Sequence, residues 1–168
     1  MKALYLLRHA KSSHAGGEAD HDRPLAERGR RAAPLIAEHM RRQKIAPALV
    51  LCSSARRTRE TLDLLAPALG DDTVRRFEDG LYQADAAALL ERLRQVPHDV
   101  PTVMLVGHNP AVQEMALTLA GGGADVERLR EKFPTAALAT LAFDGAAWHE
   151  LAPGDAELTG YVTPADLG

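Results

Sequence analysis

The stretch Ala3-Leu-Tyr-Leu-Leu-Arg-His-Ala10 decides the fold. Its five consecutive apolar residues predict a short strand buried on both faces, as in the middle of a parallel sheet. Arg8 and His9 follow this strand directly, with no turn residue between. Ligands of open α/β sheets bind just beyond the carboxyl ends of the strands. The first strand therefore predicts a binding site that contains Arg8 and His9.

Further strands and helices are expected to alternate along the chain. Apolar runs predict strands at 48–52, 73–77 and 102–106. Helical spacing of apolar residues predicts a helix over 25–44 that contains Pro34, one that ends at Gly70, one capped by Asp85 and one that starts at Pro110. Ser53 or Ser54 is expected to cap the second helix. Such alternation indicates an α/β fold, with helices on both faces of a mainly parallel sheet.

The C-terminal part predicts an antiparallel edge for this sheet. Residues 137–143 and 147–151 flank Asp144-Gly145, and an Asp-Gly pair between two apolar runs is typical of a β-hairpin. The glycines from Gly121 are expected to begin a loop, and the tail from Pro153 is expected to be irregular.

The composition is that of an ordinary soluble globule, with 46% apolar and 26% charged residues. The 168 residues predict a single domain, 1–168. A net charge of -3 gives no reason to expect nucleic acid or an anionic membrane as a partner. No apolar run approaches the roughly 20 residues of a membrane span, and a signal peptide is not evident. Cys52 is the single cysteine, so no internal disulfide can form, and a cytoplasmic location is expected.

Basic and polar residues follow all three strong strands. Arg8 and His9 follow the first, Arg57 comes shortly after the second, and His108 follows the third. Because the carboxyl ends of parallel strands share one edge of a sheet, these four side chains can converge. Arginine binds phosphate oxygens through two parallel hydrogen bonds, and each such bond contributes roughly 1.5 to 3 kcal/mol. The set predicts a site for a phosphoryl group.

The two histidines suit different steps of phosphoryl transfer. A neutral imidazole is nucleophilic at one nitrogen when an acceptor holds the other as N–H. Neighbouring arginines disfavour the charged form of His9, so we predict that His9 is the nucleophile. His108 is expected to donate to a phosphoryl oxygen. Arg8 and Arg57 neutralise the phosphoryl charge, so neither a metal ion nor a cofactor is expected. A lone histidine after a strand is more often structural, and the convergence of three strand ends favours the catalytic interpretation.

These motifs make the sequence similar to the histidine phosphatase superfamily, named for its Arg-His-Gly motif, and more closely to the SixA-type phosphohistidine phosphatases. The matching segments are Leu7-Arg-His-Ala10, Asp22-Arg-Pro-Leu25 with Gly29, the segment 53–61, Val106-Gly-His-Asn-Pro110, Phe133-Pro-Thr-Ala-Ala137 and Val162-Thr-Pro164. The resemblance implies a three-layer α/β/α sandwich, a phosphohistidine intermediate on His9, and a phosphate pocket of Arg8, Arg57 and His108. The chain departs from the pattern at Ala10, where glycine is usual.

A general acid is harder to assign. Superfamily members that act on phosphate esters use a carboxylate, usually a glutamate after the third strand. Glu78 is the candidate here, with Asp79 and Asp85 further along. The alternative is that Glu78-Asp-Gly80 is simply a turn. A weak acid suffices if the leaving group is an imidazole nitrogen.

The loop that follows His9 carries further candidates. Ser12 is expected to bind phosphate by its position in the family motif, and Arg23 to contact either phosphate or Asp22. A polar loop that gates or contacts the substrate is favoured over a metal site formed by His14, Asp20, His21 and Asp22.

The predicted function is metal-independent hydrolysis of a phosphoryl group through phospho-His9. Phosphohistidine in a protein is the expected substrate, because no long insertion is present to close a lid over a small molecule. The alternative is a phosphomonoesterase for a small metabolite or a nucleotide. A phosphoglycerate mutase is disfavoured because its acid-bearing insertion is absent. A non-catalytic phosphate-binding module is disfavoured by the intact Arg8, His9, Arg57 and His108.

Overall fold

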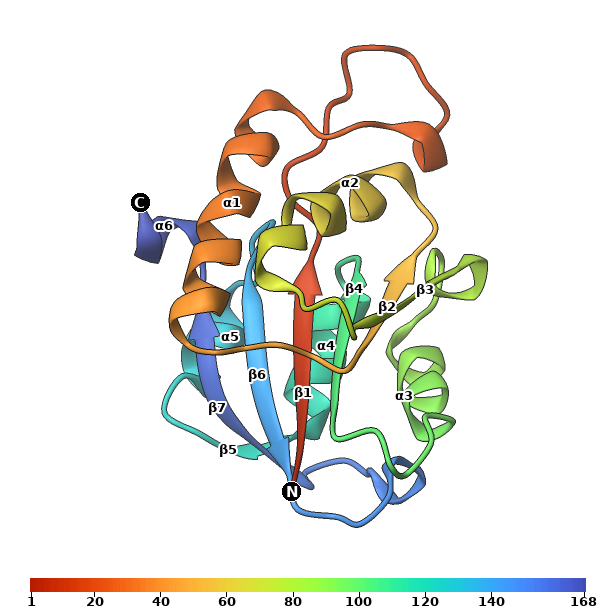
Figure 1. The fold of residues 1–168 in the computed structure, drawn as a ribbon, viewed down its shortest axis with the longest axis vertical. Coiled ribbons are helices and arrows are strands. Elements are labelled where there is room, and N and C mark those ends of the chain that lie inside the picture. The colour runs from red at the N-terminus through yellow and green to blue at the C-terminus, as the bar shows by residue number, and fades with distance from the viewer.

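The computed structural model describes residues 1–168 and contains one mixed sheet of seven strands (Figure 1). The strands are β1 (Lys2–Arg8), β2 (Leu49–Ser53), β3 (Val74–Glu78), β4 (Thr102–Gly107), β5 (Ala120–Gly122), β6 (Leu138–Phe143) and β7 (Ala156–Val162). Their order across the sheet is β3-β2-β4-β1-β6-β7-β5. The strands from β3 to β1 are all parallel, and β6 runs antiparallel to both β1 and β7. The expected mainly parallel sheet with an antiparallel part is confirmed.

Six α-helices surround the sheet. They are α1 (Glu27–Arg42), α2 (Arg56–Leu64), α3 (Ala86–Arg94), α4 (Ala111–Leu119), α5 (Val126–Glu131) and α6 (Pro164–Leu167). Figure 1 shows α1 and α2 in front of the strands and α4 behind them. None of these helices is long and apolar enough to cross a membrane.

Alternating side chains of the central strands enter two separate cores. On β1, Leu4 and Leu6 belong to a core of 26 buried residues that also takes side chains from α3, α4 and α5. Leu7 belongs to a second core of 16 buried residues, to which α1 and α2 contribute. On β4, Leu105 enters the first core and Met104 the second. Burial on both faces explains why these strands appear in the sequence as continuous apolar runs.

The structure confirms one predicted helix cap and contradicts another. Asp85 caps α3, because its carboxylate accepts a hydrogen bond from the Ala88 N–H at 2.8 Å. The cap predicted for Ser53 or Ser54 is wrong: Ala55 precedes α2 and no side chain caps it. Ser53 is instead the last residue of β2, and its hydroxyl lies against His108.

The predicted hairpin over 137–143 and 147–151 is wrong in its second strand. Residues Trp148–Glu150 form a 3-10 turn. The indole of Trp148 is fully buried in the first core and donates to the Val100 carbonyl at 2.8 Å, so packing of this side chain, and not strand pairing, holds the segment.

On its side away from β1, β6 pairs with β7, in the tail that was expected to be irregular. Its buried residues Ala156, Leu158 and Tyr161 are interrupted by polar residues and Gly160, so the apolar pattern is weak. Residues expected to begin a loop at Gly121 lie in β5, which pairs with β7.

The register of the parallel strands aligns their carboxyl ends. Arg8 pairs with Gly107, and Cys52 pairs with Val106. His9, His108 and the start of α2 therefore emerge at one edge of the sheet.

Candidate active site

His9 is held in a defined protonation state. Its backbone N–H donates to the Gly107 carbonyl at 3.1 Å, and its ring Nδ1 lies 2.7 Å from the Ala10 carbonyl oxygen. A carbonyl oxygen only accepts, so Nδ1 carries the proton. Burial lowers the pKa of His9 to about 3, and the charges of Arg57 and Arg8 act in the same direction. His9 is therefore neutral at physiological pH, and its Nε2 lone pair is free to attack.

His108 lies beside His9, with 5.3 Å between the ring centroids. Its Nε2 is 2.8 Å from the Ser53 hydroxyl, and its buried Nδ1 has no partner in the protein. Burial, together with the charge of Arg57, lowers the pKa of His108 to about 4. Two neutral imidazoles thus lie side by side at the end of the sheet.

Two arginines bring positive charge to this pair. Arg8 donates to the Phe133 carbonyl at 3.0 Å. Arg57, on the first turn of α2, is only 6% exposed. The Nε atoms of both guanidinium groups are buried and have no hydrogen-bond partner. The structure therefore brings together Arg8, His9, Arg57 and His108, the four residues predicted from the three strand ends.

A carboxylate that the sequence did not assign to the pocket is bound to these groups. Arg57 donates through Nη1 to the Asp20 backbone oxygen at 2.7 Å and through Nη2 to the Asp20 carboxylate at 3.1 Å. The Tyr82 hydroxyl donates to the same carboxylate oxygen, and Arg23 Nε donates to the other at 3.1 Å. These hydrogen bonds hold the pKa of Asp20 well below its usual range. Asp20 is an anion under physiological conditions.

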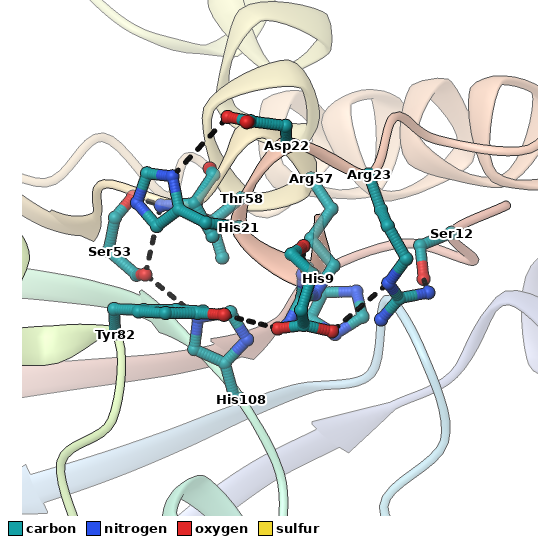
Figure 2. A network of polar contacts seen from close by, with 12 residues as sticks. His9, Ser12, His21, Asp22, Arg23, Ser53, Arg57, Thr58, Tyr82 and His108 are labelled. Carbon is teal, nitrogen blue, oxygen red and sulfur yellow. Dashed lines mark hydrogen bonds and ion pairs between the residues drawn. The ribbon is translucent and has the colours of Figure 1, made fainter. Parts of the chain in front are cut away.

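Tyr82 lies over the pocket and was not predicted. Its ring packs edge-on against His108, with 5.7 Å between centroids, and against His21 at 4.7 Å. The hydrogen bond to Asp20 raises the pKa of Tyr82, so its hydroxyl keeps its proton. Figure 2 shows Tyr82, His9, Arg57 and His108 gathered at one place.

The remaining candidates of the loop form a network beside this pocket. Arg23 Nη1 donates to the Ser12 hydroxyl at 3.0 Å, and it lies 3.1 Å from the His14 ring nitrogens. Arg23 contacts Asp20, which was not among its expected partners, whereas the expected partner Asp22 lies 3.6 Å from the ring of His21. Arg23 is connected to Arg57 through Asp20, and Ser12 is connected to Asp20 through Arg23.

The members of the alternative metal set are separated by these contacts. No three His, Cys, Asp or Glu side chains form a group that could hold a metal ion. His21 Nε2 lies 2.9 Å from the Ser54 hydroxyl, and Asp20 binds arginines instead.

Glu78 lies at the end of β3 and forms an ion pair with Arg92 of α3. Its two carboxylate oxygens accept hydrogen bonds from Arg92 Nε and Nη2 at 2.7 and 2.8 Å. The bond to Arg92 lowers the pKa of Glu78, which opposes the requirement of a general acid for a raised pKa. The structure gives Glu78 no hydrogen bond to His9, His108 or Arg57.

The comparisons with known proteins agree with this geometry. The family model of the histidine phosphatase superfamily (branch 1) matches residues 4–85. The structure superposes with a TM-score of 0.85 on a proposed phosphohistidine phosphatase SixA from Nakamurella multipartitia, which is 33% identical; the match covers 97% of this chain and 96% of that one. The chain belongs to the histidine phosphatase superfamily.

Two further relatives match nearly the whole chain. A proposed phosphohistidine phosphatase SixA from Agrobacterium tumefaciens is 31% identical, with a TM-score of 0.83 and coverage of 97% and 98% of the two chains. The uncharacterized protein Rv1276c of Mycobacterium tuberculosis is 41% identical over 162 residues, which cover 94% of this chain and 99% of that protein. Similarity extends in each case over nearly the whole length of this histidine phosphatase.

Proposed function

We propose that the protein is a metal-independent phosphatase that removes the phosphoryl group of phosphohistidine in a protein, through a phosphohistidine intermediate on His9. The observation that carries the proposal is the neutral His9 ring. The hydrogen bond to the Ala10 carbonyl oxygen fixes the ring proton on Nδ1. Arg8, Arg57 and His108 surround the ring. The arginines supply the charge neutralisation for which other phosphoryl-transfer enzymes use a metal ion.

The reaction takes place in two displacements on phosphorus. In the first, His9 Nε2 attacks, the bond from phosphorus to the substrate nitrogen breaks, and the departing imidazole keeps that bond's electron pair and takes up a proton from solvent water. In the second, water attacks the phosphoryl group of phospho-His9 and the P–Nε2 bond breaks. The water gives up one proton, and inorganic phosphate and neutral His9 result. Arg8 and Arg57 hold the phosphoryl oxygens in both steps, and His108 stabilises the charge that develops on them.

The choice of phosphohistidine over an ester is supported by the surroundings of the pocket. An imidazole leaving group needs less help from an acid than an alkoxide, and Glu78 is bound to Arg92. A cavity of about 300 Å³ opens beside His108, and Asp85 and Glu114 are among its lining residues. These carboxylates favour a neutral or cationic group next to the phosphoryl group over an anionic metabolite.

The test is to trap the intermediate. The enzyme is mixed with a protein carrying ³²P-labelled phosphohistidine and quenched in alkali, in which a phosphohistidine survives. The wild type and the exposed-histidine control His149→Asn are expected to carry label, whereas His9→Asn is not. Label retained by a folded His9→Asn protein would contradict the nucleophile assignment.

The substrate is tested by competition. Phosphohistidine protein, small phosphomonoesters and nucleotides are compared by kcat/KM, with and without a chelator. A higher kcat/KM for a phosphomonoester would favour the small-molecule alternative. Loss of activity with chelator would contradict metal independence. Binding without turnover of any substrate would identify a phosphate-binding module.

A further inference from the structure

The donors that a phosphoryl group would need are already used by an internal anion. Both terminal nitrogens of Arg57 bind Asp20, one through the backbone oxygen and one through the carboxylate. Tyr82 and Arg23 complete the binding of that carboxylate. Asp20 thus receives hydrogen bonds from three side chains that meet around one negative charge.

The Asp20 carboxylate lies close to His108. It accepts a hydrogen bond from the Tyr82 hydroxyl, and the Tyr82 ring packs edge-on against His108 with 5.7 Å between the ring centroids. The negative charge of Asp20 raises the pKa of His108, against the lowering by Arg57. Asp20 therefore lies on the His108 side of the pocket.

The carboxylate is also free to leave. The side chain of Asp20 is 56% exposed, whereas that of Arg57 is 8% exposed. Asp20 belongs to a three-residue 3-10 turn, in a loop that contains Gly16 and Gly17. A phosphoryl group brings three oxygens and up to two negative charges to Arg57, where a carboxylate brings two oxygens and one charge. Bonds made by the substrate can therefore replace those made by Asp20.

We infer that Asp20 is an internal anion that occupies the phosphoryl side of Arg57 in the ligand-free enzyme and must be displaced by the substrate. The inference rests on the proposed role of Arg57 in binding the phosphoryl group. Displacement of Asp20 lowers the affinity for every phosphoryl ligand by the same factor. A protein substrate compensates through contacts outside the pocket, and inorganic phosphate has no such contacts. Asp20 thereby keeps the affinity for inorganic phosphate, the reaction product, low, because this ligand has no contacts outside the pocket to offset the cost of displacing Asp20.

The experiment measures direct binding of inorganic phosphate by calorimetry, which does not depend on turnover. Asp20→Asn removes the charge and keeps the shape of the side chain. Asp22→Asn removes the same charge two residues away, from a carboxylate that faces His21 and not Arg57. Asp20→Asn is expected to bind phosphate about tenfold more tightly than the wild type, equivalent to about 1.4 kcal/mol. Asp22→Asn is expected to bind phosphate as the wild type does.

A second measurement uses the wild-type protein and so does not depend on the folding of a variant. Saturating phosphate is expected to shift the NMR signals of the Asp20 amide and the Tyr82 ring, because the hydrogen bond from the Tyr82 hydroxyl to the Asp20 carboxylate breaks. Equal phosphate affinity of Asp20→Asn and wild type, or bound phosphate that leaves both signals in place, would overturn the inference. Absence of hydrolysis by the wild type would overturn the proposed function alone. Absence of phosphate binding in both the wild type and Asp20→Asn would overturn the inference. The proposed function would then still be tested separately, by the rate of hydrolysis.

Discussion

Thr61 binds the backbone of Ala10: its hydroxyl oxygen accepts a hydrogen bond from the Ala10 N–H at 2.9 Å. The same hydroxyl donates to the Arg57 carbonyl at 2.7 Å. One buried side chain of α2 therefore joins the residue after the proposed nucleophile, His9, to the backbone of Arg57. This link fixes the distance between two groups that, in the proposed mechanism, act on the same phosphorus atom.

Replacing Thr61 by valine keeps the shape of the side chain and removes this bond. The Ala10 N–H is then left buried without a partner, so the free energy of unfolding in urea is expected to fall by about 1 to 3 kcal/mol. We also expect a lower kcat/KM. Thr73→Val is the control, because Thr73 donates to the Pro47 carbonyl at 2.9 Å, away from the pocket. Equal losses of kcat/KM in the two variants would argue against a positioning role for Thr61.

The pH profile should reflect the low pKa values of the two histidines. With the pKa of His9 at about 3 and that of His108 at about 4, both rings stay neutral well below the usual histidine value of 6.5. We expect kcat/KM to persist to about pH 5 and to fall only as His9 and His108 become protonated. Histidine NMR signals give the direct measurement. A midpoint between about 6 and 7 for His9 would contradict the expected neutral state.

The same two histidines should make the fold sensitive to acid. The unfolded chain takes up protons on them near their usual pKa of 6.5, while the folded protein does so only near 3 and 4. Between these pKa values the unfolded state therefore binds more protons than the folded state. The contribution of the two neutral histidines to the free energy of unfolding is lost as the pH falls through this interval. Urea unfolding of the wild type and of His9→Asn at several pH values measures the effect. The slope of unfolding free energy against pH is expected to be smaller in the variant.

Gly29 should not tolerate alanine, although alanine is the better helix former by about 1 kcal/mol. A Cβ at Gly29 would lie 2.2 Å from the Lys11 backbone oxygen, which also accepts the Ala26 N–H. We expect Gly29→Ala to lower the free energy of unfolding by about 1 to 3 kcal/mol. Gly80→Ala is the control, because a Cβ there meets no atom within 4 Å. A stabilised Gly29→Ala protein would show that helix propensity outweighs this close approach.

Glu78→Gln should affect stability more than turnover of phosphohistidine. The substitution removes the ion pair with Arg92, in which the side chains are 27% and 23% exposed. Loss of such a charged hydrogen bond is expected to cost roughly 1 to 3 kcal/mol in thermal or urea unfolding. Rates on phosphohistidine protein should stay within about twofold of wild type, since a proton-transfer role contributes roughly a hundredfold or more. A hundredfold loss in a folded protein would restore Glu78 as the acid.

The rigid part of the candidate site was predictable because it follows directly from chain order. Arg8, His9 and His108 come immediately after buried apolar strands, and parallel strands place their ends together. The two-faced burial of β1 could likewise be inferred from five apolar residues in succession. Arg8, His9 and His108 lie at or next to a strand end in the sequence, so the position of the strand in the sheet determines where their side chains lie.

Contacts between distant loops were not predictable in the same way. Tyr82 binds Asp20 across 62 residues, and Tyr82 follows a 3-10 turn that has no apolar period. For Asp20 the sequence indicates only a polar loop that gates or contacts the substrate, or a metal site, because nothing in its own segment indicates that an arginine of α2 will reach it. The strand β7 was missed for a local reason: Gly160 interrupts its alternation, and pairing with β6 stabilises it instead.

The two ends of the loop at 13–24 are held together by backbone contacts. Ser12 and Leu25 form an isolated antiparallel bridge, and the Ser13 N–H donates to the Pro24 carbonyl at 2.8 Å. Between these two ends the loop carries Asp20, which binds Arg57, and Arg23, which binds Asp20. Arg57 therefore receives part of its surroundings from a segment that is closed at its base, separately from the strand that presents His9. A change of length within 14–19 is expected to alter the affinity for ligands without moving His9.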